Sequence, residues 1–268
     1  MGRGVVYNLG MKEVHLSVVI PCFEEMSNLQ KGVLDKVNRF LDRQKISYEV
    51  IIVDDGSKDG SVDFIREFIA ENECFTLVEN KHMGKAGAVT TGILKAKGKI
   101  VLFTDMDQAT PIEEVNKLLP YFDEGYDIVI GSRAGRRKGA PIARRFISAA
   151  SIYLTRLIVG LRNISDTQCG FKAFTAKAAK DLFTELHTIH HGFKEVSGSA
   201  VTSGFDVELL YLGQNKGYKL KEVPVNWLHV ETRRVNLVKD SITGFWDLLI
   251  IRKNIMNGIY DANVKRKT

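Results

Sequence analysis

Two acidic residues stand one position apart at the end of an apolar run. The run 100–104 is typical of a strand buried on both faces of a parallel sheet, and Asp105 and Asp107 follow it directly. Side chains two positions apart in an extended segment point to the same side. The two carboxylates can therefore meet at one divalent cation, with Gln108 supplying a further oxygen. The alternative is structural: the pair ends the strand, and Asp107 caps a helix that begins at Ile112.

The elements that must position these carboxylates alternate between strand and helix through the first half of the chain. Apolar runs that end in turn residues predict the strands, and apolar residues at helical spacing predict the helices. We expect strands at residues 16–21, 49–54, 76–80, 100–104 and 127–133. We expect helices at 27–43, at 62–72 with Ser61 as N-cap, after the glycine-rich loop 82–87, and at 112–122. This alternation predicts an α/β fold with a doubly wound, mostly parallel sheet.

Polar residues follow four of the expected strands. Ligands of doubly wound sheets bind beyond the carboxyl ends of the strands, so these residues should line one edge of the sheet. Turn formation does not require acidic residues at each of these places, and the set therefore favours a cation site over simple strand termination. The four segments are Pro21 to Glu25, Asp54 to Ser57, Gly84 to Gly87 and Asp105 to Gln108.

The chain lacks both common cradles for nucleotide phosphates. PCFEE follows the first strand in place of GxGxxG, and the sequence contains no GxxxxGK[ST]. A divalent cation can bridge pyrophosphate oxygens instead, and Lys85 at the start of a helix can add a positive charge. Lys85 can also be an ordinary surface lysine.

The composition is that of a globular protein, with 44% hydrophobic and 26% charged residues in 268 positions. The three cysteines are widely separated and form no CxxC pair, which favours a reduced cytosolic setting. The N-terminal stretch 1–15 lacks the apolar core of a signal peptide, and we expect no segment of the chain to span a membrane.

Basic residues concentrate between Gly131 and Ser165, where no Asp or Glu occurs. Such a segment is expected to face phosphate groups, acidic lipid or nucleic acid, unless it is simply a solvated surface. The residues are Arg133, Arg136, Arg137, Lys138, Arg144, Arg145, Arg156 and Arg162.

Five motifs in order carry a family resemblance. VIPCFEE, IIVDDGSKDGS, NKHMGKAGAV, FTDMDQATP and IGSR resemble the family 2 glycosyltransferases of GT-A fold, which use nucleotide-diphosphate sugars and a divalent metal. In the second half, DTQCGFKAFT, FDVELLYLG and VPVNW look like the dolichyl-phosphate β-glucosyltransferases and, less closely, the dolichyl-phosphate mannose synthases. The resemblance covers roughly residues 14 to 255.

The resemblance implies roles for individual residues. Pro21, Phe23 and Glu25 would form the base and ribose pocket. Asp105 and Asp107, with Gln108, would be the DxD motif that holds Mg²⁺ or Mn²⁺. Asp54, Asp55 and Lys85 would contact the nucleotide, and Asp105 could contact its ribose as well. Arg133 would face the phosphates, and Asp206 would be the catalytic carboxylate.

Asp206 leaves several interpretations open. A hydroxyl acceptor needs a general base, and Asp206 could be that base. A lipid monophosphate is already largely ionised at neutral pH, and Asp206 would then position the site without removing a proton. Asp206 could also be a capping carboxylate near the start of a helix over 207–216.

Two segments have the composition of helices that lie in a lipid headgroup layer. Residues 141–163 place apolar side chains among arginines, and residues 241–268 end in a basic tail. The first segment could equally be an amphipathic core helix. We expect the acceptor phosphate or lipid at Arg144, Arg145, Arg233 and Arg234.

The segment between Leu186 and Phe205 is longer and richer in Gly and Ser than the family's usual connection. Its histidines, His187, His190 and His191, could belong to a metal cluster or to a mobile acceptor loop. No cysteine accompanies them and no further ligand stands at fixed spacing, which favours the loop.

We expect an N-terminal extension (1–13), a GT-A catalytic domain (14–235) and a C-terminal amphipathic helix with a basic tail (236–268). Residues 14–133 would bind the nucleotide sugar and residues 134–235 the acceptor. The expected reaction is an inverting, metal-dependent transfer of glucose from UDP-glucose onto a polyprenyl (dolichyl-type) phosphate, with GDP-mannose as a second possible donor. The protein would lie peripherally on the cytoplasmic face of an anionic membrane.

Three alternative functions stay open. A family 2 transferase could act on a sugar hydroxyl, and a nucleotidyltransferase could share the strand-end carboxylates. A basic module for lipid or nucleic acid is the non-enzyme alternative. The ordered motifs argue against it, and a nucleic-acid binder would interleave aromatic residues with the basic run.

Overall fold

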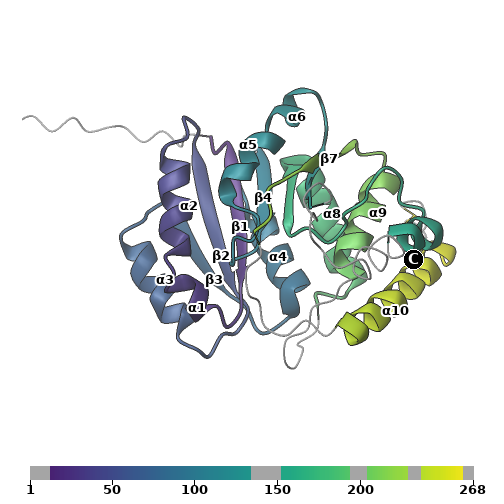
Figure 1. The fold of residues 1–268 in the computed structure, drawn as a ribbon, viewed down its shortest axis with the longest axis horizontal. Helices are drawn as coiled ribbons and strands as arrows, with labels where there is room; N and C mark the ends of the chain where they lie inside the picture. Colours follow the sequence, from purple (N-terminus) through teal and green to yellow (C-terminus); the bar gives the residue numbers. More distant parts are fainter. Residues whose placement is uncertain (1–12, 134–151, 194–203, 229–236, 262–268) are drawn as a thin grey trace, which may run out of the picture.

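The computed structural model describes residues 13–133, 152–193, 204–228 and 237–261 (Figure 1). Its described strands form one seven-stranded sheet in the order β3-β2-β1-β4-β6-β5-β7. The strands are β1 (Leu16–Cys22), β2 (Tyr48–Asp54), β3 (Phe75–Glu79), β4 (Ile100–Thr104), β5 (Ile128–Ser132), β6 (Phe171–Thr175) and β7 (Leu220–Pro224).

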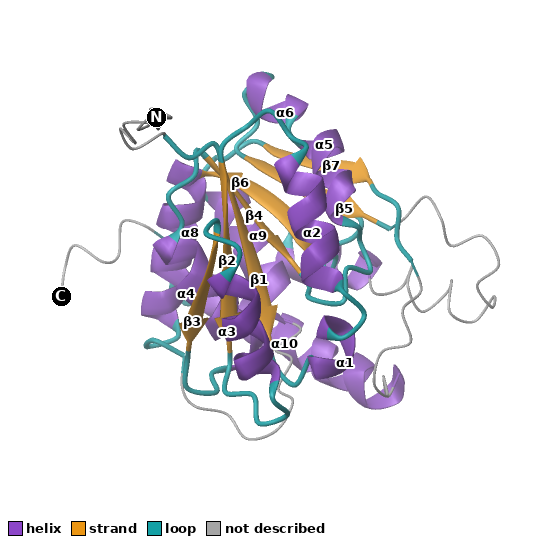
Figure 2. Ribbon diagram, turned by 90° about the vertical axis from the view of Figure 1, so that its left-hand side faces the viewer, coloured by secondary structure: helices purple, strands orange, loops and turns teal. Residues whose placement is uncertain are grey.

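Helices cover both faces of this sheet. They are α1 (Met26–Leu29), α2 (Val33–Asp42), α3 (Ser61–Ala70), α4 (Gly84–Lys95), the 3₁₀ turn η1 (Ile112–Glu114), α5 (Val115–Leu118), α6 (Pro120–Asp123), α8 (Ala176–Ile189), α9 (Gly204–Asn215) and α10 (Leu237–Met256). Residues 152–159 form a further helix. Figure 2 shows the strands as a middle layer, with α2 and α5 on one side and α4 and α8 on the other.

The alternation of side chains along the strands explains the two layers. In β1, Val19 packs into the core under α4, α8 and α9, whereas Val18 and Ile20 pack into the core under α2 and α3. The expected α/β fold with a doubly wound, mostly parallel sheet is confirmed.

Strands β6 and β7 lie outside the set expected from the sequence. Strand β6 runs antiparallel between β4 and β5, and β7 pairs parallel with β5. Because β6 runs antiparallel, its first residue, Phe171, lies at the same edge as the last residues of β4 and β5. This arrangement brings the segment before β6 to the edge where ligands of such sheets bind.

Three expectations about helices were wrong. The helix expected over 27–43 is split into α1 and α2, because Gly32 adopts a left-handed φ of 72°. The helix expected over 112–122 is split into η1, α5 and α6, and α6 begins at Pro120, whose ring favours a helix start. Ser61 is the first residue of α3 and not its N-cap, which is Gly60.

The second half of the chain adds a helical layer to the same sheet. Helix α8 packs on α4, α9 packs on α8, and α10 packs on α9 at the outer side of the molecule (Figure 1). Among the described residues, no helix combines the length and the apolarity that crossing a membrane requires. The division into nucleotide-sugar and acceptor halves stays a prediction.

Candidate active site

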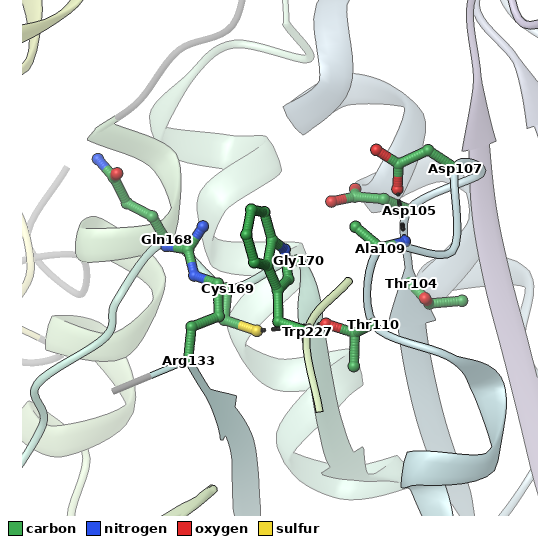
Figure 3. Close-up of a pocket in the computed structure, with 10 residues that line it drawn as sticks. All are labelled: Thr104, Asp105, Asp107, Ala109, Thr110, Arg133, Gln168, Cys169, Gly170 and Trp227. Carbon is green, nitrogen blue, oxygen red and sulfur yellow. Dashed lines mark hydrogen bonds between the residues drawn. The ribbon is translucent and has the colours of Figure 1, made fainter. Parts of the chain in front are cut away.

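A pocket of about 160 Å³ lies at the edge where β4, β5 and β7 end and β6 begins (Figure 3). It receives residues from four segments that are far apart in the sequence. Its lining residues are Thr104, Asp105, Asp107, Ala109, Thr110, Arg133, Gln168, Cys169, Gly170 and Trp227. The sequence-predicted residues Asp105, Asp107 and Arg133 are thereby brought together.

The two carboxylates of the DxD motif lie side by side at the end of β4 (Figure 3). Gln108 adopts a left-handed φ of 49° and closes a tight turn, its N–H donating to the carbonyl of Asp105 at 3.2 Å. This turn lets Asp107 Oδ1 accept the N–H of Ala109 at 2.9 Å. Asp107 therefore closes a local turn before Ala109, and it does not cap a helix at Ile112, where Pro111 is the N-cap residue.

Gly170 allows the segment before β6 to approach Asp105. A Cβ atom at Gly170 would lie 2.0 Å from Asp105 Oδ2. Any larger residue would therefore displace the carboxylate. The sequence motif DTQCGFKAFT contains this glycine, but its role depends on β6 lying beside β4, which the sequence analysis did not foresee.

Lys85, in the first turn of α4, connects the carboxylates electrostatically. Its Nζ lies 2.5 Å from Asp105 Oδ1. Burial by itself would lower the pKa of Lys85, but the charges of Asp105, Asp206 and Asp107 outweigh burial and raise it. Lys85 is thus paired with a carboxylate of the DxD motif, which excludes the interpretation of Lys85 as an ordinary surface lysine.

The donor set at the DxD motif fits a hard divalent cation. Burial and the nearby charge of Asp105 raise the pKa of Asp107, although the N–H of Ala109 opposes this increase. A bound divalent cation would stabilise the ionised form of two adjacent, partly buried carboxylates. Gln108 Oε1 is buried and accepts no hydrogen bond from a described residue.

The protein supplies few ligands of its own to such a cation. No group of three or more His, Cys, Asp or Glu side chains with metal-binding geometry occurs in the described ranges. A cation at Asp105 and Asp107 would complete its coordination with water and substrate phosphate oxygens, as is usual for Mg²⁺ at nucleotide sites. The participation of Gln108 stays a prediction.

Arg133 follows β5 and forms a two-point ion pair with Asp166. Its Nε and Nη2 donate to Asp166 Oδ2 and Oδ1 at 2.8 and 2.7 Å, and its backbone N–H also donates to Oδ2. Although burial opposes both effects, this pairing raises the pKa of Arg133 and lowers that of Asp166. Arg133 is therefore a fixed cation at the rim, and its contact with substrate phosphates stays a prediction. Asp166 was not foreseen as its partner.

Asp206 lies in the first turn of α9 and is paired with a lysine that the sequence analysis missed. Lys172 of β6 is fully buried, and its Nζ donates to Asp206 Oδ1 and to the carbonyl of Cys169. The alternating pattern of FKAFT contained the signal, because a lysine on a core-facing position of a strand requires a buried partner. The N–H of Gly204, at the start of α9, donates to Asp247 Oδ2 at 3.0 Å. Among the described contacts, no hydrogen bond has Asp206 capping this helix.

The residues expected around the nucleotide lie at the ends of β1 and β2. Asp55 is buried, and its carboxylate accepts from Met83 N and Gly84 N at 2.9 and 2.7 Å and lies 2.8 Å from His82 Nδ1. Burial raises the pKa of Asp55, although these three hydrogen bonds oppose the increase. Asp55 thus fixes the loop that leads to Lys85.

The neighbouring residues of this region have local partners as well. Asp54 Oδ2 accepts the N–H groups of Gly56 and Ser57 at 2.9 and 3.0 Å. The ring of Phe23 stacks on His82 with centroids 4.2 Å apart. Glu25 Oε2 accepts from Asn28, and Pro21 lies in β1. Their roles in nucleotide binding stay predictions.

The histidine segment is shorter than expected because α8 continues to Ile189. His190 Nε2 lies 2.6 Å from Glu208 Oε2, and Glu208 Oε1 accepts the hydroxyl of Tyr260 at 2.6 Å. Part of the expected acceptor loop, residues 194–203, lies outside the described residues. So do the four arginines assigned to the acceptor, Arg144, Arg145, Arg233 and Arg234.

The model of the family described as glycosyl transferase family 2 matches residues 17–183. The chain is 33% identical to the dolichyl-phosphate β-glucosyltransferase of Saccharomyces cerevisiae over 95% of this chain and 79% of that protein. It is 32% identical to the human protein of the same name over 94% of this chain and 79% of that protein.

Solved structures share the fold. Glucosyl-3-phosphoglycerate synthase from Mycobacterium tuberculosis, in complex with Mn²⁺, UDP and glucosyl-3-phosphoglycerate, superposes with a TM-score of 0.56 at 18% identity, covering 98% of this chain and 88% of that one. The mannosyltransferase PcManGT from Pyrobaculum calidifontis, in complex with GDP-mannose and Mn²⁺, gives 0.55 at 19% identity, covering 96% and 66%. The expected GT-A fold is thereby confirmed, and the chain belongs to glycosyl transferase family 2.

Proposed function

We propose that this protein is a dolichyl-phosphate β-glucosyltransferase that moves glucose from UDP-glucose onto a polyprenyl phosphate, with inversion at the anomeric carbon and with Mg²⁺ or Mn²⁺. The observation that supports it most is the cluster of Asp105, Asp107 and Lys85 at one sheet edge. The cluster occurs in a chain that resembles dolichyl-phosphate β-glucosyltransferases over nine-tenths of its length.

Asp105 and Asp107 would hold the cation, whose charge would stabilise the departing diphosphate. Gly170 and Lys85 keep Asp105 in place for this task, because one leaves room for the carboxylate and the other pairs with it. Arg133, fixed by Asp166, would add positive charge at the rim of the pocket, where negative charge develops as the sugar leaves.

The acceptor oxygen would form its bond to the anomeric carbon on the face opposite to the departing diphosphate. The electron pair of the broken bond would go to the diphosphate. Because the second pKa of a phosphate monoester is near 6, the acceptor is already an anion at neutral pH and no group needs to take its proton. Asp206 would then serve as a fixed charge in the site.

Peripheral contact with a membrane would bring the lipid acceptor to this site. Two helices lie at the outer side of the second half (Figure 1). Both expose apolar side chains. They are Tyr153 and Leu157 on the helix 152–159, and Phe245, Trp246 and Ile250 on α10. A helix with such a face and basic neighbours is suited to the headgroup layer of an anionic membrane.

A matrix of donors and acceptors tests the proposal. Purified protein would receive UDP-glucose or GDP-mannose, with dolichyl phosphate, dolichol or a soluble glucoside as acceptor, and with or without Mn²⁺. We expect product only from UDP-glucose, dolichyl phosphate and metal together. Transfer from GDP-mannose would contradict the proposed donor, and transfer to a hydroxyl acceptor would favour a family 2 enzyme of saccharide assembly.

A further inference from the structure

Lys172 has an unusual place for a lysine. It stands on β6, between β4 and β5 of the sheet, its side chain is 0% exposed, and its Nζ lies 5.2 Å from the ring centroid of Phe103. A buried ammonium is destabilising unless it is paired and hydrogen-bonded. The structure gives it two partners, the carbonyl of Cys169 at 2.7 Å and the carboxylate of Asp206.

The segment 169–172 connects this lysine to the pocket. Cys169 and Gly170 line the pocket, and Gly170 lies against Asp105. The carbonyl of Cys169 anchors Lys172, and the register of β6 with β4 places Lys172 opposite Phe103. The same short segment therefore holds the DxD carboxylate on one side and Asp206 on the other.

Asp206 belongs electrostatically to the site as well as to this pair. Its charge reaches Lys85, the partner of Asp105. Among the residues that the structure describes, the charged groups that this chain of contacts links to Asp206 are Lys172 on β6, Lys85 on α4, and Asp105 and Asp107 beyond Lys85. Glu208, two residues further along α9, is hydrogen-bonded to His190 and Tyr260.

This pairing bears on what Asp206 can do in the reaction. A general base must accept a proton in the transition state. If Asp206 accepted one, the Lys172 ammonium would be left fully buried without a counter-ion, which is a costly arrangement. The pair therefore suits an acceptor that arrives already ionised, such as a phosphate monoester.

We propose that Lys172 is a positioning residue that holds Asp206 as an ionised, oriented carboxylate, so that Asp206 acts as a fixed charge and not as a general base. This inference rests on the proposed function and deepens it, because it links the buried pair to the class of acceptor.

A double-mutant cycle tests the inference. Lys172→Met, Lys172→Arg, Asp206→Asn and the double variant Lys172→Met/Asp206→Asn would be assayed with UDP-glucose, dolichyl phosphate and Mn²⁺. A residue that acts only through Asp206 adds nothing once Asp206 is neutral, so the double variant should match Asp206→Asn in kcat. We expect Lys172→Met to lower kcat about tenfold or more, with KM for UDP-glucose changed less than about twofold. Lys172→Arg should restore part of kcat because it keeps the charge.

Two further readouts separate positioning from mere folding. Each variant would be checked for Mn²⁺-dependent UDP binding and for its unfolding temperature, and the double variant carries no lone buried charge even if Lys172→Met is unstable. The pH dependence of kcat/KM from about pH 6 to about pH 8 should have the same shape in the wild type and in Asp206→Asn, because Asp206 takes no proton.

Several results would overturn the inference. The first is that the losses of kcat in Lys172→Met and in Asp206→Asn multiply in the double variant. The second is that Lys172→Met keeps the kcat of the wild type. The third is that the pH profile of the wild type has an acid limb that disappears in Asp206→Asn. If the wild type is active and any of these results is found, the positioning role of Lys172 is contradicted and the proposed function is not. A wild type that transfers nothing to dolichyl phosphate contradicts the proposed function and the inference with it.

Discussion

Gly170 shows how much of the site depends on a single missing side chain. Its backbone lies against Asp105, which Lys85 holds from the other side. Gly170→Ala should therefore displace the Asp105 carboxylate and weaken Mn²⁺-dependent binding of UDP by about tenfold or more, a loss of roughly 1.4 kcal/mol. Isothermal titration calorimetry would measure it.

A second glycine of the same edge supplies the matched control. A Cβ atom at Gly131 would meet Val225 at 3.0 Å and Cys169 Sγ at 3.3 Å, and none of its three nearest atoms belongs to a site carboxylate. Gly131→Ala should leave UDP binding within about twofold of the wild type. Equal losses in both variants would mean that general crowding, and not displacement of Asp105, explains the effect.

Individual residues also mark where sequence reasoning reached its limit. Asp105 and Asp107 could be predicted because they follow an apolar strand directly, and Lys85 because it begins a helix after a glycine-rich loop. Gly170 and Lys172 act only because β6 inserts antiparallel between β4 and β5, and no local pattern states that neighbour relation. Asp166 lies 33 positions from its partner Arg133, so their pairing likewise required the fold.

At the scale of elements, α10 holds α9 at two points. Asp247 accepts the N–H of Gly204, and Tyr260, which follows α10, donates to Glu208. Tyr260 is 1% exposed and Glu208 is 4% exposed. Tyr260→Phe would leave a buried carboxylate oxygen without this donor, and should lower the free energy of unfolding by about 1–3 kcal/mol in urea titrations.

The control for this change removes a hydroxyl from the surface. Tyr153 is 66% exposed, so Tyr153→Phe should alter the free energy of unfolding by less than about 0.5 kcal/mol. If Tyr260→Phe were equally mild, the bond between Tyr260 and Glu208 would not stabilise the packing of the C-terminal segment on α9.

The link between α8 and α9 should depend on pH. The hydrogen bond to Glu208 raises the pKa of His190, with burial opposing it. Because folding raises this pKa, the charged pair stabilises the fold fully when the pH is below the pKa of His190 in the unfolded chain, about 6.5. This stabilisation is lost as the pH rises through the pKa of His190 in the folded protein. The stability advantage of the wild type over His190→Gln should therefore be largest below about pH 6.5 and decline above it.

Thermal unfolding of both proteins across this pH range would measure the advantage. Asp206 and Lys172 are intact in both proteins, so the comparison isolates the histidine. An advantage that stays constant with pH, or grows as the pH rises, would contradict the charged pair between His190 and Glu208.

The sequence patterns predicted the existence of strands and helices better than they predicted the residues at which these elements end. Apolar runs identified β1 to β5, because residues on both faces of the sheet pack into a hydrophobic core. The helices over 27–43 and 112–122 were drawn through Gly32 and Pro120, because their apolar spacing continues past those residues. The left-handed φ of Gly32 and the missing N–H of Pro120 end the helices in spite of that spacing.

At the scale of the whole molecule, the exposed apolar side chains predict how the protein meets its lipid acceptor. Trp246 and Ile250 are 60% and 55% exposed on α10. Trp246→Ser/Ile250→Ser should weaken binding to anionic liposomes at least about fivefold and leave the unfolding temperature unchanged, because exposed apolar area contributes to lipid binding and little to the fold.

Leu94 on α4 offers a control for this membrane prediction, because it is 38% exposed but belongs to the first half of the chain. Leu94→Ser should keep wild-type binding in the same flotation assay. Liposome binding that is unaffected by the α10 variant would contradict α10 as a membrane-contacting element.

The Asp105–Asp107 pair, set at the sheet edge by β4 and β6, should make the proposed hexose transfer dependent on a divalent cation. The most direct test is the rate of glucose transfer from UDP-glucose to dolichyl phosphate with Mn²⁺ and with EDTA, in the wild type, in Asp107→Asn, and in Asp123→Asn, an exposed acidic control on α6. We predict that EDTA or Asp107→Asn lowers the rate by about 100-fold or more, about 2.7 kcal/mol, whereas Asp123→Asn behaves as the wild type. Full activity in EDTA, or in a folded Asp107→Asn variant, would contradict a cation-binding role of the Asp105–Asp107 pair.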